Sequence, residues 1–96
     1  QVAVAAIEAG ATAVLGSHPH LLQRIEEYQG GLIAYSLGNF VFDGYYGPEN
    51  YSAILRLILN RNGLHAYDWF PVLIVNGLPQ SAPPKQAEEI HRMLTR

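Results

Sequence analysis

The sequence predicts a mixed α/β fold that is mostly β, with one helix at each end. Apolar side chains recur at helical spacing in the Ala-rich residues 1–9 and again in residues 86–94. Between these segments, turns at Gln29-Gly30-Gly31 and Asn62-Gly63 each separate two runs of strand-forming residues, as in β-hairpins.

The first half of the chain predicts a helix, a short strand and a hairpin. Gly10 ends the helix, because glycine readily takes the left-handed backbone that closes one. Residues 11–15 follow as a short buried strand. In the hairpin, residues 25–28 pair with residues 32–35 across the first glycine turn, and the second strand runs on through residues 36–43.

The second half predicts a longer hairpin and the closing helix. Residues 53–59 have strong β character and pair with residues 64–75 across the second turn. Pro71 either interrupts the returning strand or lies at a sheet edge, because proline cannot donate to a ladder. A Pro-rich linker follows. The apolar stripe of the closing helix consists of Ala87, Ile90 and Leu94.

The start of the chain predicts a piece of a longer protein. Gln1 leads directly into the first helix without a capping residue, which would leave the first N–H groups unsatisfied. We expect residues 1–96 to form a single segment. Residues 1–78 would hold the core strands and a histidine loop, and residues 79–96 the linker and the terminal helix.

Composition excludes several classes of protein. The absence of cysteine excludes disulfide scaffolds, thiolate zinc sites and cysteine nucleophiles. The 49% hydrophobic content and the net charge of −2 are the reverse of what disorder requires. The chain contains no signal-like segment, and no apolar run approaches the ~18 residues of a membrane span. The few basic residues are scattered, so we expect no nucleic-acid partner.

The charged fraction is low for so short a chain. Only 15% of the residues are charged, against roughly 25% in an average soluble domain. Small domains bury a modest share of their surface and normally need charges outside. We therefore expect either a large core for this size or an apolar face that something else covers.

The loop Ser17-His18-Pro19-His20 is the sharpest chemical feature. It follows the carboxyl end of the first strand, where open α/β sheets bind their ligands. Pro19 favours an extended tripeptide, in which both imidazoles project to the same side. Two neutral imidazoles form half of a zinc, iron, nickel or manganese site. Alternatively, both are ordinary loop residues and one caps a backbone carbonyl; the pattern alone favours neither.

Two ordered blocks resemble the bacterial capsule-synthesis CapA family, and together with a weaker third they span residues 1 to about 75. The first is Gly10-Ala11-Thr12-Ala13-Val14-Leu15-Gly16-Ser17-His18-Pro19-His20-Leu21-Leu22-Gln23, and the second is Tyr35-Ser36-Leu37-Gly38-Asn39-Phe40-Val41-Phe42-Asp43. The strand Asp68-Trp69-Phe70-Pro71-Val72 is similar, though less specifically.

This resemblance implies a metallophosphoesterase (calcineurin-like) fold, in which two sheets lie between helical layers. The chain would be the C-terminal portion of that four-layer α/β/β/α sandwich, and its partner would be the missing N-terminal portion of the same domain. The family is linked to poly-γ-glutamate capsule synthesis, which implies a bacterial cell-envelope protein anchored in the membrane by a segment outside this chain. Capsule or poly-γ-glutamate polymer, or a phosphoester, would be its substrate. The exposed apolar face would also allow self-association.

The resemblance also implies roles for particular residues. Metallophosphoesterases end their metal-binding series with a G-H-x-H loop, which His18 and His20 match by type and spacing. The intact protein would hold two divalent ions (Mn, Fe or Zn). Family members often carry another histidine in place of Ser17, whose hydroxyl is a candidate contact for a phosphate or a metal-bound water. Asn39 either lines the cleft or satisfies backbone groups beside Gly38, and both roles are equally favoured.

The remaining candidates have weaker support. Asp43 and Asp68 have no partner histidine at ligand spacing, and His65 and His91 are expected at the surface. The glycine-rich loop of residues 44–51 contains three tyrosines: Tyr45, Tyr46 and Tyr51. We expect them either to contact a sugar or polymer or to serve as packing anchors.

The leading hypothesis is a CapA-like, metal-dependent hydrolase to which this chain contributes two histidine ligands. A non-catalytic scaffold or polymer-binding module is the alternative, and a self-sufficient small domain with incidental histidines is a third. No catalytic residue is assigned. A dinuclear hydrolase needs several carboxylates and histidines, so this segment alone is expected to be inactive.

Overall fold

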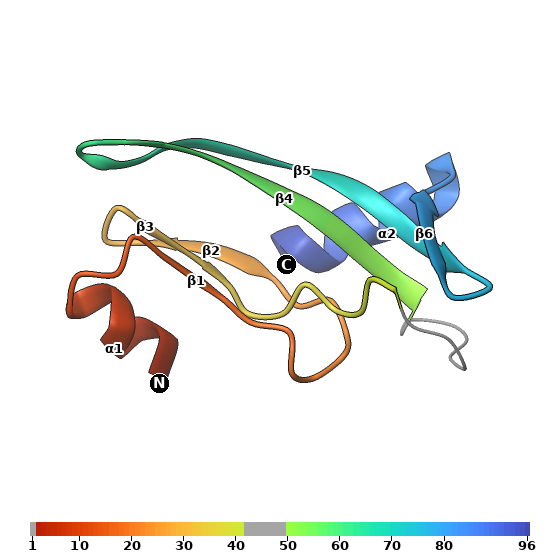
Figure 1. Cartoon of the computed structure of the whole chain (residues 1–96), viewed down its shortest axis with the longest axis horizontal. Helices are drawn as coiled ribbons and strands as arrows, with labels where there is room; N and C mark the ends of the chain where they lie inside the picture. The colour runs from red at the N-terminus through yellow and green to blue at the C-terminus, as the bar shows by residue number, and fades with distance from the viewer. Residues whose placement is uncertain (1, 42–49) are drawn as a thin grey trace.

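The computed structural model describes residues 2–41 and 50–96, which contain two helices and two three-stranded sheets in a body of 39 × 23 × 22 Å (Figure 1). This arrangement confirms the predicted mixed α/β fold, mostly strands with a helix at each end. The four-layer sandwich stays a prediction. The elements are α1 (Val2–Glu8), β1 (Ala13–Leu15), β2 (Ile25–Tyr28), β3 (Gly31–Ala34), β4 (Tyr51–Asn60), β5 (Gly63–Val75), β6 (Leu78–Ser81) and α2 (Pro84–Thr95).

The first sheet has the strand order β1-β3-β2, with β1 parallel and β2 antiparallel to β3. Every residue of the central strand β3 is buried. The predicted hairpin is present, but its turn contains two residues instead of three, because Tyr28 pairs with Gly31. Gln29 (φ 50°) and Gly30 (φ 79°) both take the left-handed backbone of a two-residue hairpin turn. Gly31 belongs to the strand, where a Cβ would lie 2.8 Å from a methyl group of Ile7 on α1.

The second strand of this hairpin ends at Ala34. The predicted continuation through residues 36–43 is therefore wrong for residues 36–41, the part of it that the structure describes. Beyond it, Leu37 forms only an isolated bridge with Leu22. Gly38 then takes a φ of 74°, which an extended strand does not allow. Asp43 lies outside the described residues.

The second sheet is antiparallel, with the strand order β4-β5-β6. Its long hairpin turns at residues 61–62, one residue earlier than predicted, since Asn60 pairs with Gly63. The Asn60 side-chain oxygen accepts the N–H of Asn62 at 2.8 Å, which stabilises the turn at this position. Strand β6 occupies part of the segment expected to be a linker.

Pro71 does not interrupt β5; it lies where the pairing with β6 ends and β5 becomes the edge of the sheet. It pairs with Ala53 of the neighbouring strand β4, and its carbonyl accepts the N–H of Ala82 at 3.1 Å. The nitrogen and carbonyl of one strand residue face the same neighbour. The missing N–H of Pro71 therefore faces the chain just beyond the last residue of β6, where the ladder has ended and requires no donor.

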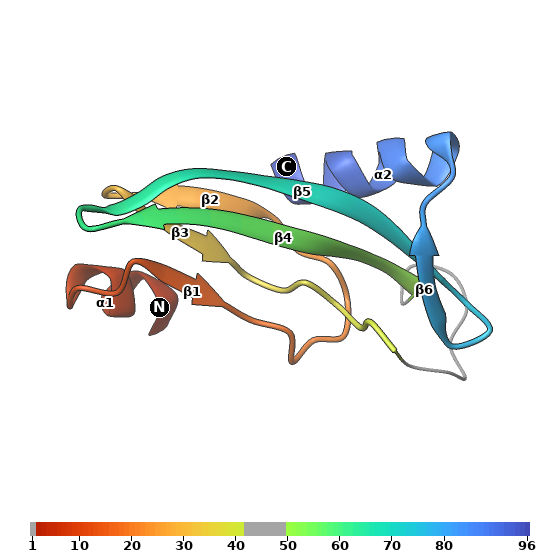
Figure 2. The same ribbon diagram turned by 45° about the horizontal axis from the view of Figure 1, so that its top comes forward.

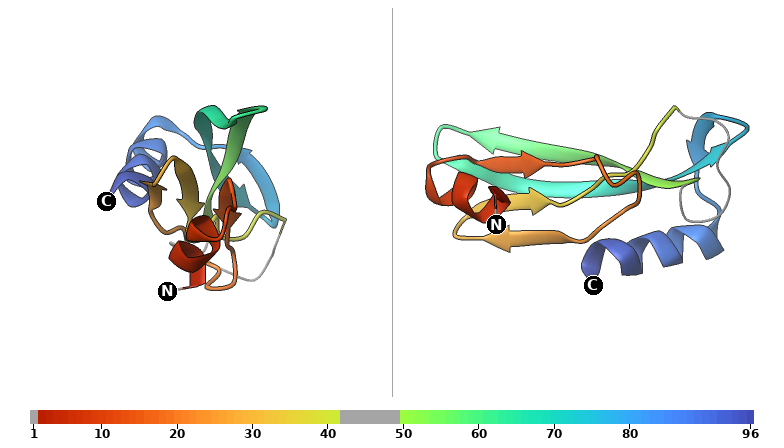
Figure 3. Two further views of the ribbon diagram at one scale, coloured as in Figure 1. Left: turned by 90° about the vertical axis from the view of Figure 1, so that its left-hand side faces the viewer. Right: turned by 90° about the horizontal axis from the view of Figure 1, so that it is seen from below.

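The core lies where α2 meets both sheets. Ile90 and Leu94 are fully buried and pack with Leu22 and Ala53, which confirms the predicted apolar stripe of the closing helix. The second sheet runs alongside the first (Figure 2), and the Tyr67 hydroxyl on β5 donates to Glu27 of β2 at 2.8 Å. Viewed along the long axis, the two helices lie on different sides of the sheets (Figure 3). No helix in the described ranges is long and apolar enough to cross a membrane.

One face of the β4–β5 hairpin remains apolar and open. Ile54 and Ile58 on β4 and Phe70 on β5 each keep 47% of their surface exposed. Between them, the Arg56 Nε donates to Asp68 at 2.9 Å, and the Arg56 guanidinium lies 5.2 Å from the Phe70 ring centre. This face provides the partly exposed apolar surface that the low charged fraction suggested. It is called the outer face below.

The contrast between buried and exposed leucines tests this packing. Replacing Leu94, which is fully buried, by Ala removes apolar contacts and leaves a cavity. We expect the free energy of unfolding to fall by about 2–5 kcal/mol in urea titrations followed by Trp69 fluorescence. Leu78 is 60% exposed and is the matched control; L78A is expected to cost less than about 1 kcal/mol. Equal losses in the two variants would contradict the assigned core.

Candidate metal centre at the histidine loop

Residues Ser17 to His20 form an exposed loop that leaves the end of β1. The sheet continues one step past β1, because the Gly16 N–H donates to Ala34 at 2.9 Å and the Gly16 carbonyl accepts from Leu37 at 2.9 Å. A Cβ at residue 16 would lie 2.4 Å from the backbone oxygen of Tyr35. Only glycine therefore fits immediately before the loop.

The tripeptide His18-Pro19-His20 is not extended, and in this respect the prediction is wrong. The N–H of His20 donates to the carbonyl of Ser17 at 3.0 Å and closes a turn. His20 takes a φ of 62°, in the left-handed region that histidine enters more often than most residues.

The turn nevertheless brings the two imidazoles together. Their ring centres are 6.1 Å apart, with the ring planes inclined at 51°. Zn–N bonds are about 2.0–2.1 Å long, so the centres of two rings on one ion lie roughly 5 Å apart at a tetrahedral angle and at most about 6.5 Å apart. The separation of His18 and His20 lies within the upper limit for one shared divalent ion, and a tetrahedral ion would draw the two rings closer together.

Asn39 meets this loop from the segment that follows β3. Its side-chain oxygen Oδ1 lies 2.7 Å from Nδ1 of His20, although the two residues are 19 positions apart in the sequence. Asn39 is 5% exposed, whereas Ser17, His18 and His20 all lie at the surface. Three of the four candidate site residues therefore lie at the surface. The fourth, Asn39, is buried and lies at hydrogen-bonding distance from His20.

The segment that carries Asn39 is fixed by side chains that the sequence did not single out. The hydroxyl oxygen of the buried Ser36 accepts the N–H of Gly38 at 3.2 Å, and the Ser52 hydroxyl on β4 donates to the carbonyl of Leu37 at 3.0 Å. A Cβ at Gly38 would lie 3.1 Å from the backbone oxygen of Tyr51. The sequence offered one signal for these contacts, because Ser36 and Ser52 are polar residues that each stand between largely apolar neighbours.

The described residues supply two imidazoles and no further His, Cys, Asp or Glu ligand beside them. No group of three or more His, Cys, Asp or Glu side chains suited to a metal occurs in residues 2–41 and 50–96. Asp68 pairs with Arg56, and the ring of His91 lies 5.5 Å from that of Trp69. His65 is exposed on β5. The candidates that lie outside the described residues are Asp43, Tyr45 and Tyr46.

Tyr51 packs against the core and is half-buried. A hydrogen bond to Glu89 on α2 raises the pKa of the Tyr51 hydroxyl, with a smaller contribution from burial. These contacts favour the packing-anchor role over contact with a polymer.

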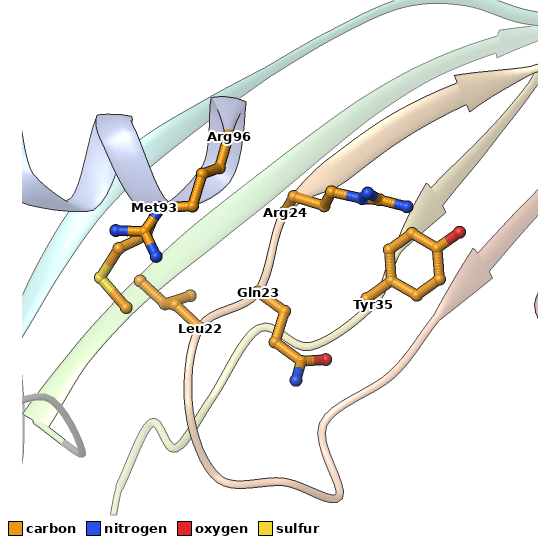
Figure 4. Close-up of a pocket in the computed structure, with 6 residues that line it drawn as sticks. All are labelled: Leu22, Gln23, Arg24, Tyr35, Met93 and Arg96. Atoms are coloured by element: carbon orange, nitrogen blue, oxygen red, sulfur yellow. The ribbon is translucent and has the colours of Figure 1, made fainter.

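A separate cavity of about 490 Å³ lies between the end of α2 and the segment that leads into β2 (Figure 4). The Arg24 guanidinium lies 4.8 Å from the Tyr35 ring centre and 3.3 Å from Glu26. The Arg96 side chain extends back over Met93 on the opposite wall (Figure 4). The lining contains neither histidine of the loop, so this cavity is distinct from the candidate metal centre.

Comparison with known proteins identifies the family. Residues 1–44 match the family model described as bacterial capsule synthesis protein PGA_cap. The chain is 38% identical over 96 residues to the capsule biosynthesis protein CapA of Bacillus anthracis, an alignment that covers 99% of this chain and 23% of that protein. The chain belongs to the bacterial capsule synthesis family. It is also 42% identical over 86 residues to the PGA biosynthesis protein CapA of Bacillus subtilis (strain 168), covering 90% of this chain and 22% of that protein.

The matches to the capsule synthesis family cover the candidate site. The family model includes the whole histidine loop and Asn39, while the pairwise alignment with the Bacillus anthracis protein extends over both sheets and α2. The chain spans about a quarter of the length of these curated relatives. The two imidazoles therefore belong to a region that this family shares.

Two glycines test the close approach that holds the Asn39 segment. Gly38 and Gly30 have similar φ values of 74° and 79°, but of the two only Gly38 has neighbours within 4 Å of the place that a Cβ would occupy. G30A is expected to cost roughly 1–2 kcal/mol of stability for the left-handed backbone alone. G38A is expected to cost about 1–3 kcal/mol more, because a methyl group crowds β4. Urea titration measures both, and equal costs would contradict the tight contact.

Proposed function

We propose that His18 and His20 hold a divalent metal ion in a hydrolase of capsule or poly-γ-glutamate biosynthesis. The observation that carries the proposal is the pair of imidazoles 6.1 Å apart on a strand-end loop, one of them hydrogen-bonded to a buried amide. Neutral imidazoles suit Zn or Fe ions, and a Mn ion would need oxygen ligands beside them. Membership of the capsule synthesis family supplies the biological setting, since both named relatives are biosynthesis proteins.

The donor set fits such an ion only in part. Two imidazoles leave a divalent ion mostly hydrated, so the remaining ligands would come from residues outside those that the structure describes. In the full-length protein we infer two ions, which would polarise a phosphoryl oxygen and activate water as the nucleophile. Within this chain, His18 and His20 would bind metal, and the exposed Ser17 beside them would contact the phosphoryl group or a water.

The setting of the full-length protein follows from the same proposal. We infer a bacterial cell-envelope protein whose membrane anchor lies in a segment other than the one described. The outer face, with Ile54, Ile58 and Phe70 half exposed, would pack against the rest of the same domain. If the chain is produced alone, that face would promote self-association instead. The polymer, or a phosphoester derived from its synthesis, would be the substrate.

A non-catalytic scaffold that binds the polymer is the second candidate. Its support is the absence of a third ligand beside the histidines among the described residues. The part of the full-length sequence that precedes this chain would distinguish the hydrolase from the scaffold. Intact aspartate and histidine motifs there would favour a hydrolase, and substituted carboxylates would favour a scaffold.

Metal content tests the ligand assignment. In the full-length protein, changing His18 and His20 together to Ala is expected to remove at least one equivalent of bound metal, measured by plasma mass spectrometry after dialysis, because two ligands are lost. Changing His65 and His91 to Ala removes the same number of imidazoles away from the loop and is expected to leave the metal content unchanged. Full metal content in the double loop variant would contradict the proposal.

A further inference from the structure

The contact between Asn39 and His20 has a chemical consequence beyond holding the loop in place. An amide side chain carries its acceptor on Oδ1 and its donors on Nδ2. The atom that faces Nδ1 of His20 at 2.7 Å is Oδ1, which can only accept. Nδ1 must therefore carry the hydrogen, and in the neutral ring the lone pair then lies on Nε2.

We propose that Asn39 is a positioning residue that selects the Nδ1–H tautomer of His20 and thereby presents Nε2 as its metal-binding atom. The tautomer follows from the hydrogen bond alone, whereas the ligand role of Nε2 rests on the proposed function. Metal-binding histidines commonly donate their other N–H to an acceptor that orients the ring. Asn39 would serve as that acceptor here.

The asymmetry in burial indicates which partner imposes its geometry. His20 is exposed on a turn, whereas Asn39 is 5% exposed. The backbone that leads into Asn39 is also restrained: Gly38 donates to Ser36, and Leu37 accepts from Ser52 and donates to Gly16. The segment that leads into the buried Asn39 is therefore tied to both sheets, and the exposed ring would adapt to the amide.

The two histidines differ in this respect. Among the described residues, His18 has no hydrogen-bonded amide or carboxylate behind its ring, which lies beside the ring of His20. His20 would thus be a pre-oriented ligand, and His18 would adjust when an ion binds. A merely structural role for Asn39 would affect stability without changing which nitrogen of His20 carries the hydrogen.

The tautomer is directly measurable in the full-length protein labelled with ¹⁵N-histidine. Long-range ¹H–¹⁵N spectra at a pH where the rings are neutral are expected to show His20 as the Nδ1–H tautomer without added metal. N39A is expected to convert this signal to a mixture of tautomers. N39D preserves an oxygen acceptor and is expected to restore the Nδ1–H form. N62A, in the exposed β4–β5 turn, is the matched control and should leave His20 unchanged.

A second readout links the tautomer to metal. N39A is expected to weaken Mn²⁺ binding by roughly 10- to 100-fold, with substantial recovery in N39D. An Nε2–H tautomer in the unaltered protein, or a tautomer that does not respond to N39A, would overturn the proposal. If the tautomer responds as expected while Mn²⁺ binds nowhere near the loop, the positioning claim stands and the proposed metal function fails.

Discussion

The hydrogen bond between His20 and Asn39 is possible because β1 and β3 run parallel and adjacent. Parallel neighbours end at the same edge of a sheet, so the segments that follow them meet there. One segment carries the two histidines on an exposed turn, and the other carries the buried amide. Backbone bonds from residue 16 to residues 34 and 37 continue the pairing past the formal end of β1. The candidate site therefore depends on strand order more than on any single side chain.

The second sheet contributes rigidity to this edge. Ser52 on β4 bonds the carbonyl of Leu37, while the close approach of Gly38 to Tyr51 leaves no space for a side chain. Ala53 on the same strand β4 packs in the hydrophobic core with Leu22, just beyond the loop, and with Ile90 and Leu94 of α2. A pair of imidazoles would hold an ion weakly, but pre-orientation lowers the cost of ordering them when the remaining ligands arrive. The partial donor set and the open outer face are both consistent with a chain that spans about a quarter of its relatives.

Periodicity and turn chemistry predicted both hairpins and the buried stripe of α2, because these depend on local spacing. Errors arose where tertiary contacts decide the outcome. The strand after β3 was expected to continue because its residues favour β structure, yet Gly38 turns the backbone away. Pro71 fits within β5 because its nitrogen faces the chain beyond β6, which no local pattern reveals. The histidines were recognisable from the motif, whereas the acceptor role of Asn39 required knowing that positions 20 and 39 meet.

The central claim is that His20 Nε2, oriented by Asn39, and His18 bind one metal ion. Anomalous diffraction at the manganese edge from crystals of the full-length protein grown with Mn²⁺ tests it most directly. We expect a peak at bonding distance from Nε2 of His20 and from the His18 ring, with Nδ1 of His20 still facing Asn39. A peak on Nδ1 of His20, or strong manganese peaks only at sites away from this loop, would contradict it.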